Sequence, residues 1–237
     1  MTFLLECKKA KRIGFYPALI GSSILAAAIP ILNIIIRGEI DVTASKSPLQ
    51  GLLGANWQLM TMLNILFIAA SASLLYHTEY ADNAMQKLYT LPIHEGSVFY
   101  GKTLFISVMS LLTLTVEFSA LAFCSYYWYT PENSFILELC QNFGYSLLLL
   151  LPCVVLALLI SEFCQSMWMS LGICVVCVFI ATMLPTDQFL LSLFPFALPF
   201  QMLDTAQTVP YLCAACTELL ILIVTEKIAV KIRRSIS

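Results

Sequence analysis

Charged residues are scarce in this sequence. Lys, Arg, Asp and Glu together make up 11% of its 237 residues, whereas a soluble domain carries about 25%. Only two histidines are present, and no H-E-x-x-H pattern exists, so zinc-protease chemistry is unsupported. A set of Ser, His and Asp for nucleophilic catalysis cannot be assembled either. These absences argue against a soluble enzyme.

Long apolar stretches fill most of the chain, which is 60% hydrophobic. A bilayer-spanning helix needs about 20 mostly apolar residues, because each residue rises about 1.5 Å through about 30 Å of hydrocarbon. A lone strand cannot satisfy its backbone in lipid, so the stretches must be helical. We therefore predict an all-α polytopic integral membrane protein, with one transmembrane domain over residues 1–237. The six expected spans are Phe15–Ile36, Ala55–Tyr76, Thr103–Ser125, Cys140–Ile160, Met167–Leu184 and Val209–Thr225.

The basic residues lie mostly on one side of these spans, and this asymmetry predicts the orientation. Arg37 and Lys46 lie on the opposite side from the other ten, and an even number of spans agrees with two cytoplasmic termini. The ten are Lys8, Lys9, Lys11, Arg12, Lys87, Lys102, Lys227, Lys231, Arg233 and Arg234. The predicted outer side carries Glu39, Asp41, Glu132, Glu138, Asp187 and Asp204. This acidic excess reflects either ordinary topology bias or attraction of a cationic substrate.

Three segments outside the spans have distinctive patterns. Residues 1–12 are amphipathic and fit a short helix lying on the membrane surface among lipids. Residues 77–102 form a long cytoplasmic loop, in which Met85, Leu88 and Leu91 recur at helical spacing before Pro92. This pattern predicts a short helix that docks on a cytoplasmic partner. Residues 185–210 are apolar but interrupted by four prolines, which predicts external half-helices dipping into the bilayer.

Two further patterns bear on chemistry. Gly96–Thr103 matches the P-loop spacing G-x-x-x-x-G-K-[ST], but a polar segment precedes it and an apolar span follows it, so we do not expect nucleotide binding. Lys102 is instead expected among the phosphate headgroups. Glu117 and Glu218 lie inside spans, where a carboxyl group must face protein or water, or be protonated. Either they line one cavity and contact substrate or handle protons, or they are structural carboxyls between helices.

The segment from Glu79 to Leu91, followed by Leu91-Pro92-Ile93 and then Gly101-Lys102, resembles the ABC-2 type permeases. The six spans, amphipathic N-terminus and proline-broken external segment are also similar, particularly to lantibiotic-immunity permeases of the epidermin and mutacin protection group. The resemblance implies that this segment is a coupling helix docking on a separate ATPase. The implied coupling residues are Glu79, Asp82, Met85, Lys87, Leu88, Leu91 and Pro92. The Arg often found before the Leu-Pro segment is missing here, where Tyr89-Thr90 stands.

The resemblance implies a permease subunit of an ATP-driven exporter in a bacterial plasma membrane. ATP and Mg would then bind to a cytoplasmic ATPase dimer, and this chain would bind no cofactor, metal or nucleic acid. A second permease would complete the transporter as a homodimer or heterodimer. A cationic antimicrobial peptide is the leading substrate, and a drug, lipid or other small amphiphile is the alternative. Two functions of other kinds also stay open: a stand-alone membrane scaffold or sensor, and an intramembrane enzyme.

Overall fold

The computed structural model describes residues 2–37, 47–81, 95–129, 134–164, 166–184, 189–203 and 208–236, and every regular element in these ranges is helical. The all-α prediction is therefore confirmed. The elements are α1 (Thr2–Ile13), α2 (Phe15–Arg37), α3 (Pro48–Ala81), α5 (Glu95–Trp128), α6 (Phe135–Phe163), α7 (Met167–Met183), α8 (Phe189–Ser192), the 3-10 turn η2 (Leu198–Phe200) and α9 (Thr208–Ile236).

Five helices, α2, α3, α5, α6 and α9, are long and apolar enough to cross a membrane. They contain five of the six predicted spans. The remaining span, Met167–Leu184, forms α7 with 17 residues, and such a helix rises about 25 Å, short of the hydrocarbon thickness of about 30 Å. The sixth crossing and the cytoplasmic location of the termini stay predictions.

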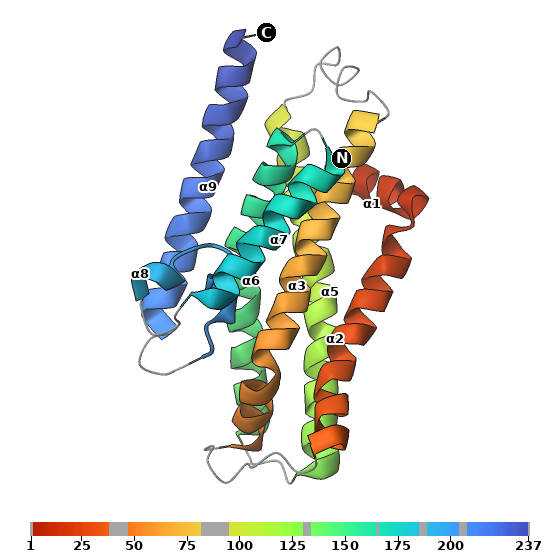
Figure 1. The fold of residues 1–237 in the computed structure, drawn as a ribbon, viewed down its shortest axis with the longest axis vertical. Helices are drawn as coiled ribbons and strands as arrows, with labels where there is room; N and C mark the ends of the chain where they lie inside the picture. Colours follow the sequence, from red (N-terminus) through yellow and green to blue (C-terminus); the bar gives the residue numbers. More distant parts are fainter. Residues whose placement is uncertain are drawn as a thin grey trace.

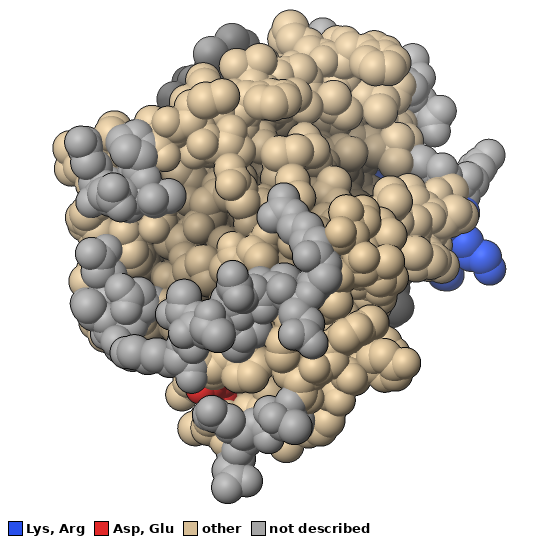
Figure 2. Space-filling model, turned by 60° about the horizontal axis from the view of Figure 1, so that its bottom comes forward, with Lys and Arg blue, Asp and Glu red and all other residues tan. Residues whose placement is uncertain are grey.

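The long helices stand side by side in one bundle, and α1 lies across one end of it (Figure 1). The last turn of α3, the first turn of α5 and the C-terminal end of α9 lie at this same end. Helix α3 packs against α2, α5, α6 and α7, so it forms the centre of the bundle. At the opposite end, the described surface is almost entirely free of Lys, Arg, Asp and Glu (Figure 2).

Helices α1 and α2 meet at Gly14, whose φ of 75° lies in the left-handed region that a side chain disfavours. This turn lets α1 run across the bundle rather than along it (Figure 1). The helix predicted for residues 1–12 is thus present. Its buried side, which includes Glu6 and Ala10, packs on α5, while Lys8 and Lys11 are exposed.

Helices α3 and α5 run past the ends expected from hydropathy, so the predicted loop at 77–102 is helical at both ends. Helix α3 continues to Ala81 because its polar side chains find partners inside the fold. Thr78 Oγ1 donates to the Leu75 carbonyl oxygen at 3.0 Å, and the Tyr80 hydroxyl donates to the Glu162 carbonyl oxygen at 2.7 Å. Glu79, the first residue of the predicted coupling helix, belongs to the last turns of α3, and the rest of that prediction beyond Ala81 lies outside the described residues.

The proline-broken segment forms α8 and η2, which have four and three residues. These single turns are shorter than the expected half-helices. Pro195 has no N–H group to continue helical hydrogen bonding after α8, whereas Pro199 stands in the first turn of η2, where proline is tolerated. Phe196 and Leu198 are buried, and the indole Nε1 of Trp57 in α3 donates to the Phe200 carbonyl oxygen at 3.2 Å. The segment is thereby fastened to the central helix.

Candidate functional site

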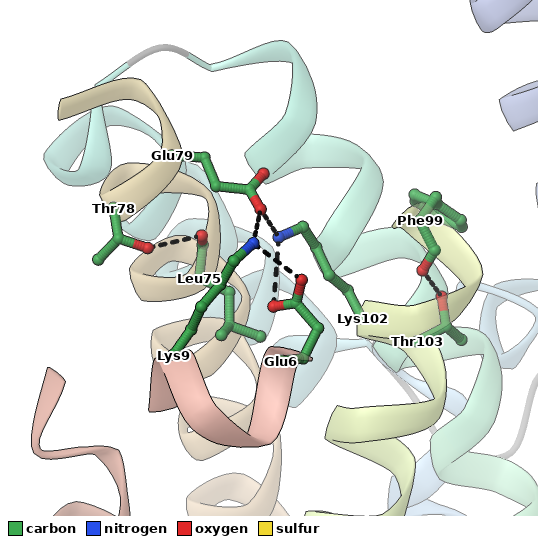
Figure 3. A network of polar contacts seen from close by, with 8 residues as sticks. All are labelled: Glu6, Lys9, Leu75, Thr78, Glu79, Phe99, Lys102 and Thr103. Carbon is green, nitrogen blue, oxygen red and sulfur yellow. Dashed lines mark hydrogen bonds and ion pairs between the residues drawn. The ribbon is translucent and has the colours of Figure 1, made fainter. Parts of the chain in front are cut away.

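Four charged side chains meet where α1 crosses α3 and α5 (Figure 3). The ammonium group of Lys102 lies 2.6 Å from Glu79 Oε1, and that of Lys9 lies 2.8 Å from the same oxygen. Glu6 closes the cluster, with 3.1 Å from its Oε1 to Lys9 Nζ and 3.6 Å from its Oε2 to Lys102 Nζ. Two lysines and two carboxylates make this ion cluster electrically neutral.

The ion cluster has a buried interior and one open edge. Lys102 is 0% exposed and Glu79 is 2% exposed, whereas the side chain of Lys9 is 41% exposed. The Lys102 ammonium also lies 4.9 Å from the centre of the Tyr76 ring, within the range of a cation–π contact. Burial alone would lower the pKa of Lys9, but its hydrogen bond to Glu79 and the attraction of Glu79 and Glu6 outweigh that effect and raise this pKa.

The location of Lys102 differs from the sequence-based expectation. Its ammonium group lies inside the protein between two carboxylates, not at the headgroups. The P-loop interpretation fails for a related reason, because Gly96–Thr103 lies within α5. From Phe99 onward the backbone N–H groups of this stretch bond within the helix, so the stretch is not the strand-to-helix loop that cradles phosphates in a P-loop.

The ion cluster joins the two helices that flank residues 82–94 to the N-terminal helix. Glu79 lies two residues before the end of α3, and Lys102 lies seven residues after the beginning of α5. Of the residues implied in ATPase coupling, Glu79 is buried and engaged within the chain. Asp82, Met85, Lys87, Leu88, Leu91 and Pro92 lie outside the described residues.

A second polar site lies in the middle of the bundle, around Glu117 of α5. This side chain is 1% exposed, and its Oε2 accepts a hydrogen bond from Asn64 Nδ2 of α3 at 2.8 Å. The other oxygen, Oε1, is buried and has no hydrogen-bond partner in the described part of the chain. A cavity of about 20 Å³ adjoins the pair, which is room for one water molecule.

Glu218 does not share this cavity, contrary to the expectation that both carboxyls line one space. It lies on α9, is 8% exposed, and neither of its carboxyl oxygens has a hydrogen-bond partner among the described residues. A buried carboxyl group without partners is costly. Its presence is therefore not explained by hydrogen bonding between helices.

Three members of these sites escaped the sequence analysis. Glu6 and Lys9 stand three residues apart in α1, and this spacing is typical of an ion pair on one helix face. The pairing of Lys9 with Glu79, 70 residues along the chain, has no signal in the sequence. Asn64 is a polar residue within an apolar run, and this is the signal that would have marked it as a partner for Glu117.

Comparison with known proteins identifies the family. Residues 2–181, from α1 to the end of α7, match the family model described as ABC-2 family transporter protein. No curated protein and no solved structure matches the chain. The matched region covers well over half of the sequence, and its apolar helices fit a multi-pass protein of the plasma membrane. The chain therefore belongs to the ABC-2 family of transporter membrane proteins.

Proposed function

We propose that this chain is the membrane-spanning permease subunit of an ATP-driven exporter. Members of its family are transport components rather than catalysts, which supports a division of labour with a separate ATPase. In this proposal a cytoplasmic ATPase dimer binds ATP and Mg, and a second permease subunit, identical or related, lies beside this chain. In the described structure the cavity at Glu117 admits one water molecule, and the bundle with this small cavity is termed closed below.

The ion cluster is the observation that carries the coupling part of the proposal. Because Glu79 and Lys102 are bonded to each other and to α1, the helix ends flanking residues 82–94 are mechanically linked. A push by the ATPase on residues 82–94 would then displace α3, α5 and α1 together. We assign docking to the side chains of Asp82, Met85, Lys87, Leu88 and Leu91, with Pro92 ending the docking segment. Glu79 is the anchor of that segment rather than part of its surface.

A cationic amphipathic peptide is the substrate that we propose, as in lantibiotic immunity. Support comes from Glu117 and Glu218, two buried carboxyl groups that have no cationic partner among the described residues. Both are candidates for the translocation path, because opening of the bundle would expose negative charge to a cation. Export of a drug, lipid or other small amphiphile is the alternative. In that case the transporter should show no preference for positively charged substrates.

Substitution in the docking segment tests the proposal. Leu88→Asp and Leu91→Asp should abolish substrate export and reduce recovery of an ATPase with the tagged chain, while membrane insertion is unchanged. The matched controls are Leu88→Met and Leu91→Met, which keep an apolar side chain of similar volume at each position. Export and ATPase recovery equal to the unmodified protein in both docking variants would refute the coupling role. A wild-type chain that reproducibly purifies alone would instead support a scaffold, a sensor or an intramembrane enzyme.

A further inference from the structure

The cavity at Glu117 is a built polar site inside an apolar bundle. Besides Glu117 and Asn64, its wall includes the hydroxyl-bearing side chains of Thr61 and Ser146, both buried. Ser146 Oγ donates its proton to the Asn142 carbonyl oxygen at 2.7 Å, so its lone pairs are left to accept a hydrogen bond. The site thus supplies acceptors close to a carboxyl oxygen that has no partner.

The charges around the cavity decide the protonation state of Glu117. Helices α3, α5 and α6 and the turn η2 form its wall, and Glu117 is the single titratable side chain among the residues that line it. An ionised carboxylate there would have one neutral donor, Asn64, and no cation. Isolated buried charges of this kind neutralise by binding a proton instead.

A protonated carboxyl group fits the same geometry. Its C=O oxygen accepts from Asn64 Nδ2, which leaves Oε1 to carry the O–H. The cavity that Glu117 lines has space for one water molecule, and Thr61 and Ser146 line it too. The Glu79 carboxylate is the opposite case, because two ammonium groups lie within 2.8 Å of its Oε1. The two buried glutamates are therefore expected to differ in charge although they are similarly buried.

We propose that Glu117 is a proton-binding site whose charge depends on conformation. It is neutral in the closed bundle and becomes a carboxylate when the bundle opens and water enters, at which point it attracts the positive charge of the substrate. In this step the carboxyl O–H bond breaks, its proton passes to an entering water molecule, and the electron pair stays on the carboxylate. The second half of the inference rests on the proposed function, whereas the neutral closed state does not.

Infrared spectroscopy of the purified chain in lipid nanodiscs tests the closed state without any partner protein. The C=O stretch of a protonated carboxyl group is separate from the bands of a carboxylate. At neutral pH, the spectrum of the wild type minus that of Glu117→Gln should contain one protonated-carboxyl band that shifts in D₂O. The matched control is Glu138→Gln, since Glu138 is half-buried and accepts from Ser47 Oγ at 2.9 Å; it should remove carboxylate bands only.

Two further spectra make the outcome decisive. Asn64→Leu keeps Glu117 but removes its donor, so the protonated band should move to higher frequency rather than disappear, even if Glu117→Gln fails to fold. The proposal would be overturned if Glu117→Gln removed only carboxylate bands, or if the protonated-carboxyl band did not shift in Asn64→Leu. In the complex with its ATPase, trapped with a non-hydrolysable nucleotide, the band should weaken. An unchanged band there overturns the conformational half, while failure to form that complex counts against the proposed function instead.

Discussion

Helices α3 and α9 are both apolar and nearly equal in length, yet they are held in the bundle in different ways. In the most apolar 18-residue stretch of α3, 67% of the residues are buried, against 22% in the corresponding stretch of α9. Polar bonds reach from α3 to most of its neighbours, through Asn56 to α2, Asn64 to α5 and Ser73 to α7. In contrast, α9 packs mainly on α6 through Tyr211, Ala214 and Ala215.

Of these two helices, α3 lies inside the region that matches the family model and α9 lies beyond it. The family match ends at residue 181, before α8 and α9. Within a membrane, helices associate by close packing and hydrogen bonds, because lipid removes the hydrophobic driving force between them. We infer that α3 is fixed by specific bonds, whereas α9 is fixed by the fit of small side chains.

The largest expected effect is at the ion cluster. Lys102→Met removes the buried cation and leaves Glu79 with Lys9 alone, so the free energy of unfolding should fall by about 3–5 kcal/mol. The thermal unfolding midpoint in mild detergent measures this loss. Lys11→Met, at an exposed position of α1, is the control. The double variant Glu79→Gln/Lys102→Met should recover most of the lost unfolding free energy. Equal midpoints for Lys102→Met and Lys11→Met would show that the ion cluster does not hold α1 to the core.

A smaller effect is expected where α9 meets α6. Ala214→Leu adds volume to a buried contact and should cost about 1–3 kcal/mol by overpacking. Its neighbour Cys213 is exposed, so Cys213→Leu should leave the unfolding midpoint unchanged. If both variants behave alike, small side chains do not determine how α9 is held.

A single hydrogen bond between α3 and α7 should contribute less. Ser170→Ala removes a hydroxyl group that lies 2.9 Å from Ser73 Oγ and 3.0 Å from the Met167 carbonyl oxygen of its own helix. The expected cost of losing the bond between the helices is about 0.6 kcal/mol. The control is Thr182→Ala in the same helix, because its hydroxyl is exposed and bonds only to the Phe179 carbonyl oxygen. If Ser170→Ala lost more unfolding free energy than Ala214→Leu, the ranking of these two contacts would be reversed.

The smallest effect on stability is expected at Glu218. Because its carboxyl oxygens have no partner within the described fold, Glu218→Leu should leave the unfolding midpoint unchanged or raise it. Glu117→Leu is the contrast, since it strands the Asn64 amide and should lower stability. A transport assay on the same variants completes the test, because a stable Glu218→Leu protein that no longer exports substrate identifies a carboxyl kept for function.

Hydropathy predicted the helices well, and α2 begins at the expected residue, Phe15. The helix ends were predicted less well, because Thr78, Glu79 and Tyr80 are polar but find partners inside the protein. Lys102 shows the same limit: a lysine at the end of an apolar run indicates a membrane surface, and only the approach of Glu79 from another helix explains its burial. Glu117 was identified as a candidate from its type and position, but its separation from Glu218 depends on how α9 packs.

Photo-cross-linking in native membranes can show directly whether an ATPase contacts the segment between α3 and α5. A photo-reactive amino acid at Leu88 samples the proposed docking segment, and one at Tyr127 samples the opposite end of α5, where the side chain is 71% exposed. The account predicts a cross-linked ATPase subunit at position 88 and none at position 127. An ATPase adduct absent from position 88, or equally abundant at both positions, would contradict a permease coupled to ATP through the α3–α5 connection.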